Sequence, residues 1–467
     1  CLFTKCVYLD NERFFHKLPL CAIFSQNIMN MKNLFLTFSL FVFVNLTFGQ
    51  SNNLTQKEIN EIVDSLCIAL EKNYFDTNLC KGLVQLLKES RQNGKFSNIN
   101  SPTLFETKLD SIIRGFTKDD HFKVVYDEQW VKDNSKYKNT KQYQELLEIE
   151  KTESKKINYG FQEVKILGAN IGYLKFTSFE NPEFAAYTLA NSMSFLQNTD
   201  AIILDLRNNT GGYTEMMALV CSYFLNTTED WYIPLTEMRL MKNGKEILIQ
   251  NNALGAVGSP KMFNTKLYIL TNYRTFSAAE WTSFVLQNRK RATIVGEKTA
   301  GGTHPTNQVI ISSKYSINIP IGTMVDAITK THFEGKGVIP DIKVPANDAL
   351  IYAQIDFLEE ASQNSSDKEL YEWYLLDLKS ELKPILISQK KLSTYVGKYG
   401  NIELTVIDNF LYSSREGIKT ELIPLTENTF KLKGRDDLRI KVITENGKAI
   451  AIERLLANGI VLRTNKE

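Results

Sequence analysis

The sequence is poor in histidine and cysteine, and it carries almost no net charge. Its 467 residues include only 4 His and 6 Cys, and the formal net charge is +2. A charge so close to balance gives no argument for binding nucleic acid. No cysteine pair has the spacing of a zinc knuckle, because even Cys67 and Cys80 lie too far apart. A mechanism that needs histidine therefore has few candidates, namely His16, His121, His304 and His332.

Long apolar runs are missing as well. The run at residues 34–48 is shorter than the roughly 20 residues that a membrane-spanning helix needs. It follows a short basic start at Met31-Lys32-Asn33, and the small residues Thr47 and Gly49 stand where a signal peptide is cut. We therefore expect residues 31–49 to be a signal peptide, with an uncleaved anchor as the alternative.

This interpretation makes residues 1–30 an upstream translation extension, and it starts the mature chain near Gln50, in the periplasm or outside the cell. After cleavage the chain would have no stable membrane insertion. It would keep three cysteines. Cys67 and Cys80 could pair across a helix–loop–helix, whereas Cys221 stands in an apolar helix, where a cysteine is usually buried.

Hydrophobic periodicity divides the rest of the chain. Alternation of apolar strands with amphipathic helices predicts crossover units and a layered α/β core, and the last region alternates apolar and polar residues as a small all-β domain does. The predicted ranges are 50–127 (helical region), 128–157 (solvated connector), 158–347 (α/β core), 348–390 (helical linker) and 391–467 (β domain).

The stretch from Leu267 to Gly302 organises the core. An apolar strand ends and a helix begins at Ser277. The Ser277 hydroxyl would therefore lie at the positive end of the helix, beside free backbone N–H groups. Acyl transfer needs a nucleophile presented in this way. Ser277-Ala278-Ala279-Glu280 is also a capping box, which is a purely structural alternative.

A glycine loop, Asn208–Gly212, follows another buried strand. It lacks the residues of a phosphate loop, so phosphate binding is not predicted. Either the loop is a bare turn, or the N–H groups of Gly211 and Gly212 point into a site that a side chain would block. Asp205 and Arg207 beside it are expected to form a structural ion pair.

Four ordered motifs, DLRNNTGG, TFSAAE, GEKTAGG and FEGKGVIPDI, together resemble the C-terminal processing (tail-specific) serine peptidases. The upstream DDHF resembles the branch with the tricorn core and the interphotoreceptor retinoid-binding protein modules. The resemblance implies a ClpP/crotonase-like layered core, whereas the helical bundle before it and the small all-β domain after it are predicted from hydrophobic periodicity. The resemblance also implies an endopeptidase that acts on polypeptides through an acyl-enzyme, without metal or organic cofactor. With about 37 residues between His121 and Tyr159, we expect no PDZ domain.

The resemblance also implies roles for residues. Ser277 matches the nucleophile, and Gly211, Gly212 and the Ala278 N–H match the oxyanion side. Many members use a Ser–Lys dyad, but Gly302 stands where that lysine would be, which disfavours a dyad.

The tricorn-like branch uses a histidine base and a supporting glutamate instead, which His121 and Glu334 match. Imidazole is the natural base near neutral pH. His304 is the rival base, and the sequence leaves open whether Glu334 touches His121. A hydrophobic-ligand-binding protein on the same fold is the alternative function, with an esterase as a third, but Ser277, His121 and Glu334 together favour the peptidase.

Overall fold

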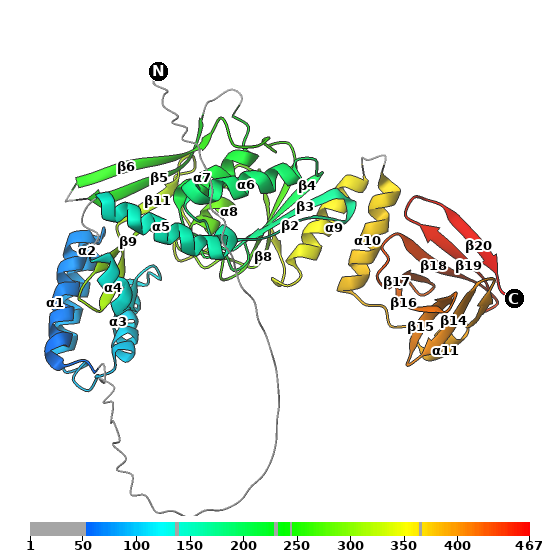
Figure 1. Ribbon diagram of the computed structural model, residues 1–467, viewed down its shortest axis with the longest axis horizontal. Coiled ribbons are helices and arrows are strands. Elements are labelled where there is room, and N and C mark those ends of the chain that lie inside the picture. Colours follow the sequence, from blue (N-terminus) through cyan, green and yellow to red (C-terminus); the bar gives the residue numbers. More distant parts are fainter. Residues whose placement is uncertain (1–52, 136–139, 228–231, 243–244, 364–366) are drawn as a thin grey trace, which may run out of the picture. The chain divides into compact units, whose positions relative to one another are not determined.

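The computed structural model describes residues 53–135, 140–227, 232–242, 245–363 and 367–467 (Figure 1). The predicted extension and signal peptide, residues 1–49, lie outside these ranges. Within them, no helix is both long and apolar enough to cross a bilayer. The fold is mixed α/β with helices before the core and an antiparallel sheet after it, which confirms the predicted class.

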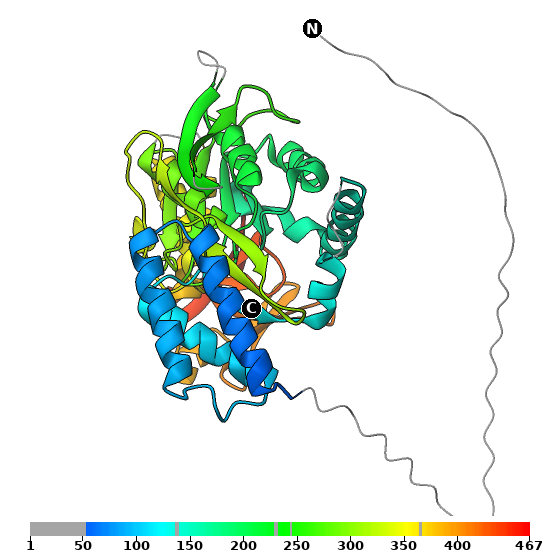
Figure 2. The ribbon, with the colours of Figure 1, turned by 90° about the vertical axis from the view of Figure 1, so that its left-hand side faces the viewer.

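Three helices open the described chain: α1 (Gln56–Asn73), α2 (Thr77–Gln92) and α3 (Pro102–Thr117). The start of α3 follows from its local sequence, because the Ser101 hydroxyl accepts a hydrogen bond from the Leu104 N–H and Pro102 is the first helical residue. Their apolar faces share a core with a small sheet in the order β1-β10-β9. Figure 2 shows the blue helices beside the yellow-green β9–β10 hairpin.

In this small sheet, β1 (Lys123–Tyr126) and β9 (Thr306–Ile310) both pair antiparallel with the central β10 (Tyr315–Pro320). Two strands antiparallel to the same neighbour run in the same direction. Their first residues therefore lie at the same end of the sheet, on either side of β10, although they are far apart in sequence. Residues just before β1 and just before β9 are brought together in this way.

The central sheet has six strands in the order β12-β8-β7-β4-β3-β2. All neighbours are parallel except β2 and β3. One apolar core lies between this sheet and α6, α7 and α8, and a second lies against α9 and α10 (Figure 1). Strands covered on both faces read as continuous apolar runs, as in Ala201–Asp205. The strands are β2 (Phe161–Leu167), β3 (Ile171–Phe176), β4 (Ala201–Asp205), β7 (Lys266–Thr271), β8 (Thr293–Gly296) and β12 (Ile342–Lys343). The helices are α6 (Pro182–Leu196), α7 (Thr214–Phe224), α8 (Ala278–Asn288), α9 (Ala349–Ser362) and α10 (Lys368–Leu382).

A further sheet has the order β11-β5-β6, from the hairpin β5 (Tyr232–Lys242) and β6 (Lys245–Leu254) with β11 (Gly322–Asp326). Our sequence analysis assigned no structure to this hairpin. The physical reason is its exposure, since Leu248 and Leu254 face solvent. A hairpin that is solvated in this way does not show the regular alternation of apolar and polar residues by which a half-buried strand is recognised.

The predicted connector is helical where it is described, with α4 (Glu128–Asn134) and α5 (Thr140–Lys156). Cys67, Cys80 and Cys221 are free and buried. The expected ion pair joins Asp205 Oδ2 to Arg207 Nη2 at 2.5 Å.

After the short α11 (Gln389–Ser393), eight strands form one antiparallel meander with its own apolar core. Arg439, from the central part of this sheet, stacks 3.6 Å over the ring of Trp373 on α10 and pairs with Asp377 at 2.7 Å. The strands are β13 (Gly397–Tyr399), β14 (Ile402–Ile407), β15 (Phe410–Arg415), β16 (Ile418–Pro424), β17 (Thr429–Leu432), β18 (Leu438–Glu445), β19 (Lys448–Leu456) and β20 (Val461–Asn465).

Candidate active site

Ser277 occupies a strained turn between β7 and α8. Its backbone has φ 52° and ψ −121°, a conformation that residues other than glycine rarely adopt. The predicted capping box is confirmed, and within it Glu280 Oε2 accepts the Ser277 N–H at 2.9 Å. A capping box alone does not require positive φ at the N-cap. The strain instead matches the sharp strand-to-helix turn on which hydrolases present a nucleophilic serine.

The glycine loop reaches Ser277 because β4 and β7 are parallel neighbours, so the loops at their carboxyl ends meet. The Phe276 N–H bonds to the Asn209 carbonyl at 2.9 Å. A Cβ on Gly211 would lie 2.7 Å from Ser277 Cβ and 2.8 Å from the Ala278 nitrogen. Only glycine permits this approach, as the sequence predicted for one reading of the loop.

Three backbone N–H groups, those of Gly211, Gly212 and Ala278, lie near the serine. The Gly211 N–H bonds to Asn209 Oδ1 at 2.9 Å, so this donor is taken within the loop. In the described part of the chain, the N–H groups of Gly212 and Ala278 have no hydrogen-bond acceptor. Free N–H groups at a turn and at a helix start suit a developing oxyanion.

Buried Glu280 ties the turn to the next glycine segment. Its carboxylate accepts hydrogen bonds from Thr299 Oγ1 at 2.5 Å, the Gly301 N–H at 2.6 Å and the Gly302 N–H at 2.9 Å, besides that of Ser277. Burial raises the pKa of this carboxyl, and the hydrogen bonds oppose that rise. Glu280 thus ties the backbone of Ser277 to the backbone of Gly301 and Gly302.

His121 and Asp119 form a buried pair just before β1. His121 Nδ1 lies 2.9 Å from Asp119 Oδ1, which also accepts the His121 backbone N–H at 2.9 Å. His121 is 7% exposed, and its Nε2 has no hydrogen-bond partner among the described residues. A carboxylate on Nδ1 fixes the tautomer that leaves Nε2 free to accept a proton.

The second carboxylate oxygen of Asp119 contacts another histidine, His304. His304 Nδ1 lies 2.8 Å from Asp119 Oδ2, and the two histidine rings are 5.8 Å apart between centroids. His304 precedes β9 as His121 precedes β1, which explains the meeting. Burial raises the pKa of Asp119, but hydrogen bonds from His121 and His304 outweigh it and hold that pKa well below its ordinary range. Burial lowers the pKa of His304, yet the Asp119 hydrogen bond and the Glu334 charge leave it raised.

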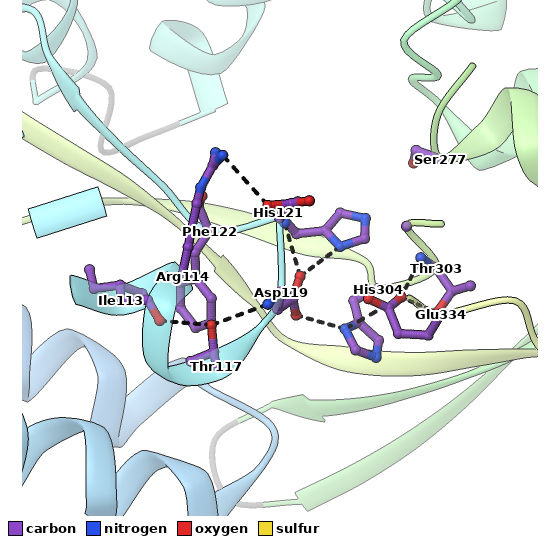
Figure 3. A network of polar contacts seen from close by, with 12 residues as sticks. Ile113, Arg114, Thr117, Asp119, His121, Phe122, Ser277, Thr303, His304 and Glu334 are labelled. Carbon is purple, nitrogen blue, oxygen red and sulfur yellow. Dashed lines mark hydrogen bonds and ion pairs between the residues drawn. The ribbon is translucent and has the colours of Figure 1, made fainter. Parts of the chain in front are cut away.

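Glu334 lies next to this pair without touching His121. Its Oε2 accepts the Thr303 N–H at 2.6 Å and the Thr303 hydroxyl at 2.7 Å, and lies 3.8 Å from His304 Nδ1 (Figure 3). Figure 3 shows Ser277 apart from the chain of contacts that runs from His121 through Asp119 and His304 to Glu334.

Gly302 lies against the rings of Phe276 and His121. A Cβ there would lie 2.1 Å from the ring of Phe276 and 2.8 Å from His121 Cε1. The rings of Phe276 and His121 are themselves 4.8 Å apart. The space that a lysine side chain at residue 302 would enter is therefore filled by these two rings.

One pocket of about 660 Å³ collects most of these groups. Ser277, Gly212, His121 and His304 all line it, and Met238 and Met324 supply apolar walls. Sequence reasoning identified Ser277, His121, Gly211, Gly212, Ala278 and Glu334, but it gave no site role to Asp119 or Glu280. Asp119 had one available signal, its place two residues before His121 in the DDHF segment.

Comparison with known proteins bears on the core. Residues 170–344 match the model for Peptidase family S41. A carboxyl-terminal-processing protease of Synechocystis sp. is 30% identical over 134 residues, 29% of this chain and 29% of that protein. A carboxyl-terminal-processing protease of Picosynechococcus sp. is 29% identical over 185 residues, 38% of this chain and 40% of that protein. The chain thus spans less than half the length of these curated relatives. A lipoprotein from Streptococcus agalactiae aligns at a TM-score of 0.43 and 18% identity, over 64% of this chain and 95% of that chain. The family and relative matches confirm the resemblance to C-terminal processing serine peptidases.

Proposed function

We propose that this chain, with an S41 peptidase core, is an exported serine endopeptidase that cleaves polypeptides through an acyl-enzyme. The observation that carries the proposal is the strained turn at Ser277, which stands beside the unpaired N–H groups of Gly212 and Ala278. A helix cap needs neither the strain nor the free donors. Catalysis of acyl transfer needs both.

The roles follow from chemistry. Ser277 Oγ attacks the scissile carbonyl carbon, and its proton passes to His121 Nε2. The N–H groups of Gly212 and Ala278 stabilise the oxyanion, while Gly211 supplies the close approach. His121 then protonates the leaving amine, and water hydrolyses the acyl-enzyme in the second half-reaction.

Asp119 is the residue that orients His121 in this proposal, because it contacts Nδ1 directly. Glu334 supports the site at one remove, through Thr303 and the neighbouring His304. No hydrogen bond links Ser277 with His121 in the described structure. Catalytic hydrogen bonds are often formed only when substrate is bound, so this does not weigh against the pair.

The test is labelling by a fluorophosphonate, which reacts with activated serines. Wild type should label, and Ser277→Ala and His121→Ala should not. Ser97→Ala is the matched control, since Ser97 is an exposed serine outside the pocket and should leave labelling intact. Absence of labelling in folded wild type would favour the ligand-binding alternative.

Export rests on the apolar run at residues 34–48 that follows Met31-Lys32-Asn33. N-terminal sequencing of protein recovered outside the cytoplasm should give a start near Gln50. A mature start before Met31 would contradict the proposal of export by this segment.

A further inference from the structure

We propose that Asp119, His121, His304 and Glu334 form a binding site for Zn²⁺, and that the bound ion reversibly switches the active site off. These four residues are called the His–Asp–His–Glu cluster below. Inhibition rests on the proposed peptidase function, whereas metal binding does not.

The donor set is that of a transition-metal site. Each of the four residues offers one ligand atom, and these atoms all lie within 4.8 Å of one another. Two imidazoles and two carboxylates suit Zn²⁺, which takes four nitrogen, oxygen or sulfur ligands in a tetrahedron. With bonds of about 2.0–2.2 Å, the ligand atoms of such a tetrahedron stand roughly 3.3 Å apart.

The existing distances are close to that spacing. Asp119 Oδ1 lies 2.9 Å from His121 Nδ1, and Asp119 Oδ2 lies 2.8 Å from His304 Nδ1. Glu334 Oε2 lies 3.8 Å from His304 Nδ1. The ligand atoms that lie furthest apart, by up to 4.8 Å, would have to approach by as much as about 1.5 Å for an ion to bind among them. The ion would displace the protons that now lie between the nitrogens and the carboxylate oxygens.

The cluster is also supported and accessible as metal sites are. Glu334 is held by two hydrogen bonds from Thr303, and Asp119 by the backbone N–H of His121. Such outer contacts orient ligands in advance. Asp119 and His121 are buried, but His121 and His304 line the pocket, which supplies an entry path.

Occupancy would remove the base. Once Nδ1 of His121 coordinates an ion, the imidazole loses its carboxylate partner, and a positive charge beside it weakens its attraction for a second proton at Nε2. His121 could then no longer take the proton of Ser277. The cluster therefore couples zinc availability to peptidase activity.

The first arm of the test measures binding without catalysis. Isothermal titration of Zn²⁺ into the full-length Ser277→Ala chain should give one tight site, and Mg²⁺ should give none, because Mg²⁺ prefers six oxygen ligands. Adding His304→Gln should weaken zinc binding by more than about tenfold, the least expected when a metal's support is lost. Glu445→Gln, a control at an exposed carboxylate outside the cluster, should leave it unchanged.

The second arm measures fluorophosphonate labelling of wild type. Zn²⁺ should slow the labelling at least tenfold, EDTA should restore it, and Glu334→Gln should weaken the inhibition. Absence of zinc binding to Ser277→Ala, or unchanged binding in both folded His304→Gln and Glu334→Gln chains, would overturn the zinc site. Tight binding in a chain that never labels would instead leave the site standing and refute the peptidase.

Discussion

The two halves of the site are built by different means. The nucleophile half, made of Gly211, Gly212, Ser277, Ala278 and Glu280, is held by hydrogen bonds from backbone N–H groups. These donate to a carbonyl of the neighbouring loop or to the Glu280 carboxylate. The base half, the His–Asp–His–Glu cluster, is held mostly by contacts between side chains.

Their carboxylates differ accordingly. Backbone donors surround Glu280, and burial raises its pKa, whereas two imidazoles surround Asp119 and lower its pKa. The difference teaches that the nucleophile half depends on rigid chain geometry, while the base half depends on charge and tautomer. Apart from Ser277 itself, substitutions should therefore act on stability in the first half and on chemistry in the second.

The largest effect should come from Ser277, where strain and chemistry coincide. Ser277→Ala and Ser277→Gly should both lower activity by at least about 10⁴-fold, since each removes the nucleophile. Ser277→Gly should be the more stable of the two by about 1 kcal/mol, because glycine adopts positive φ without strain. Peptide turnover and thermal denaturation measure these effects. Equal stability of the two variants would contradict the claim of strain.

Asp119→Asn should act mainly on chemistry. An amide can hold His121 in the wrong tautomer, and removal of a triad carboxylate in this way costs about 10³–10⁴-fold in turnover. The matched control is Asp64→Asn, whose side chain is 57% exposed and pairs with Arg91 Nη1 at 2.6 Å, outside the pocket. The control should lose less than about threefold, as expected for a weak surface pair. Peptide turnover by both purified variants measures the difference, and equal losses would refute the role of Asp119.

Gly302, where the two halves meet, should respond in both ways. Gly302→Ala forces a Cβ against Phe276 and His121, which should cost about 1–3 kcal/mol in stability and at least tenfold in activity. Gly115→Ala is the control, since a Cβ on this helical glycine meets nothing within 4 Å and should stabilise by up to about 1 kcal/mol. Unchanged activity in Gly302→Ala would show that the two halves are not coupled at this contact.

The supporting glutamates should separate the halves by stability alone. Glu280→Ala leaves three backbone N–H groups and a hydroxyl unpaired in a buried place, which should cost about 3 kcal/mol or more in unfolding free energy. Glu334→Ala should cost roughly 1 kcal/mol, because Glu334 is partly exposed and water can replace it at Thr303. Urea unfolding of each variant measures the order, and a reversed order would break the comparison.

A carboxylate outside both halves supplies the smallest effect, a dependence of stability on pH. Burial opposes ionisation of Asp326, but hydrogen bonds from the Thr329 N–H and Arg289 lower its pKa. Because the folded pKa lies below the unfolded value, this stabilisation is present above about pH 4 and is lost as the pH falls through the folded pKa. Melting temperatures of Asp326→Asn and wild type should therefore converge on acidification. A gap that widens at low pH would contradict this sign.

Local sequence determined much of this protein. The capping box at Ser277, the Ser101 start of α3 and the apolar strand before Asp205 could be predicted, because hydrogen bonding within four residues and burial of a short strand are local properties. The positions of Ser277 and of the glycine loop at neighbouring strand ends also follow from the order of strands and helices. The solvated hairpin β5–β6 escaped prediction for lack of an apolar stripe.

Tertiary structure alone decided the rest. The positive φ of Ser277 arises where the loops after β4 and β7 press together, and no residue of TFSAAE signals it. Asp119 meets His304 because β1 and β9 flank β10 in the same direction, a pairing of strands about 180 residues apart. Glu334 reaches Thr303 and His304 because its loop bonds to the glycine segment, where the Gly335 N–H donates to the Gly301 carbonyl at 2.9 Å. Contacts of this kind depend on which distant strands pair, and a pattern of residue types along the chain does not contain that information.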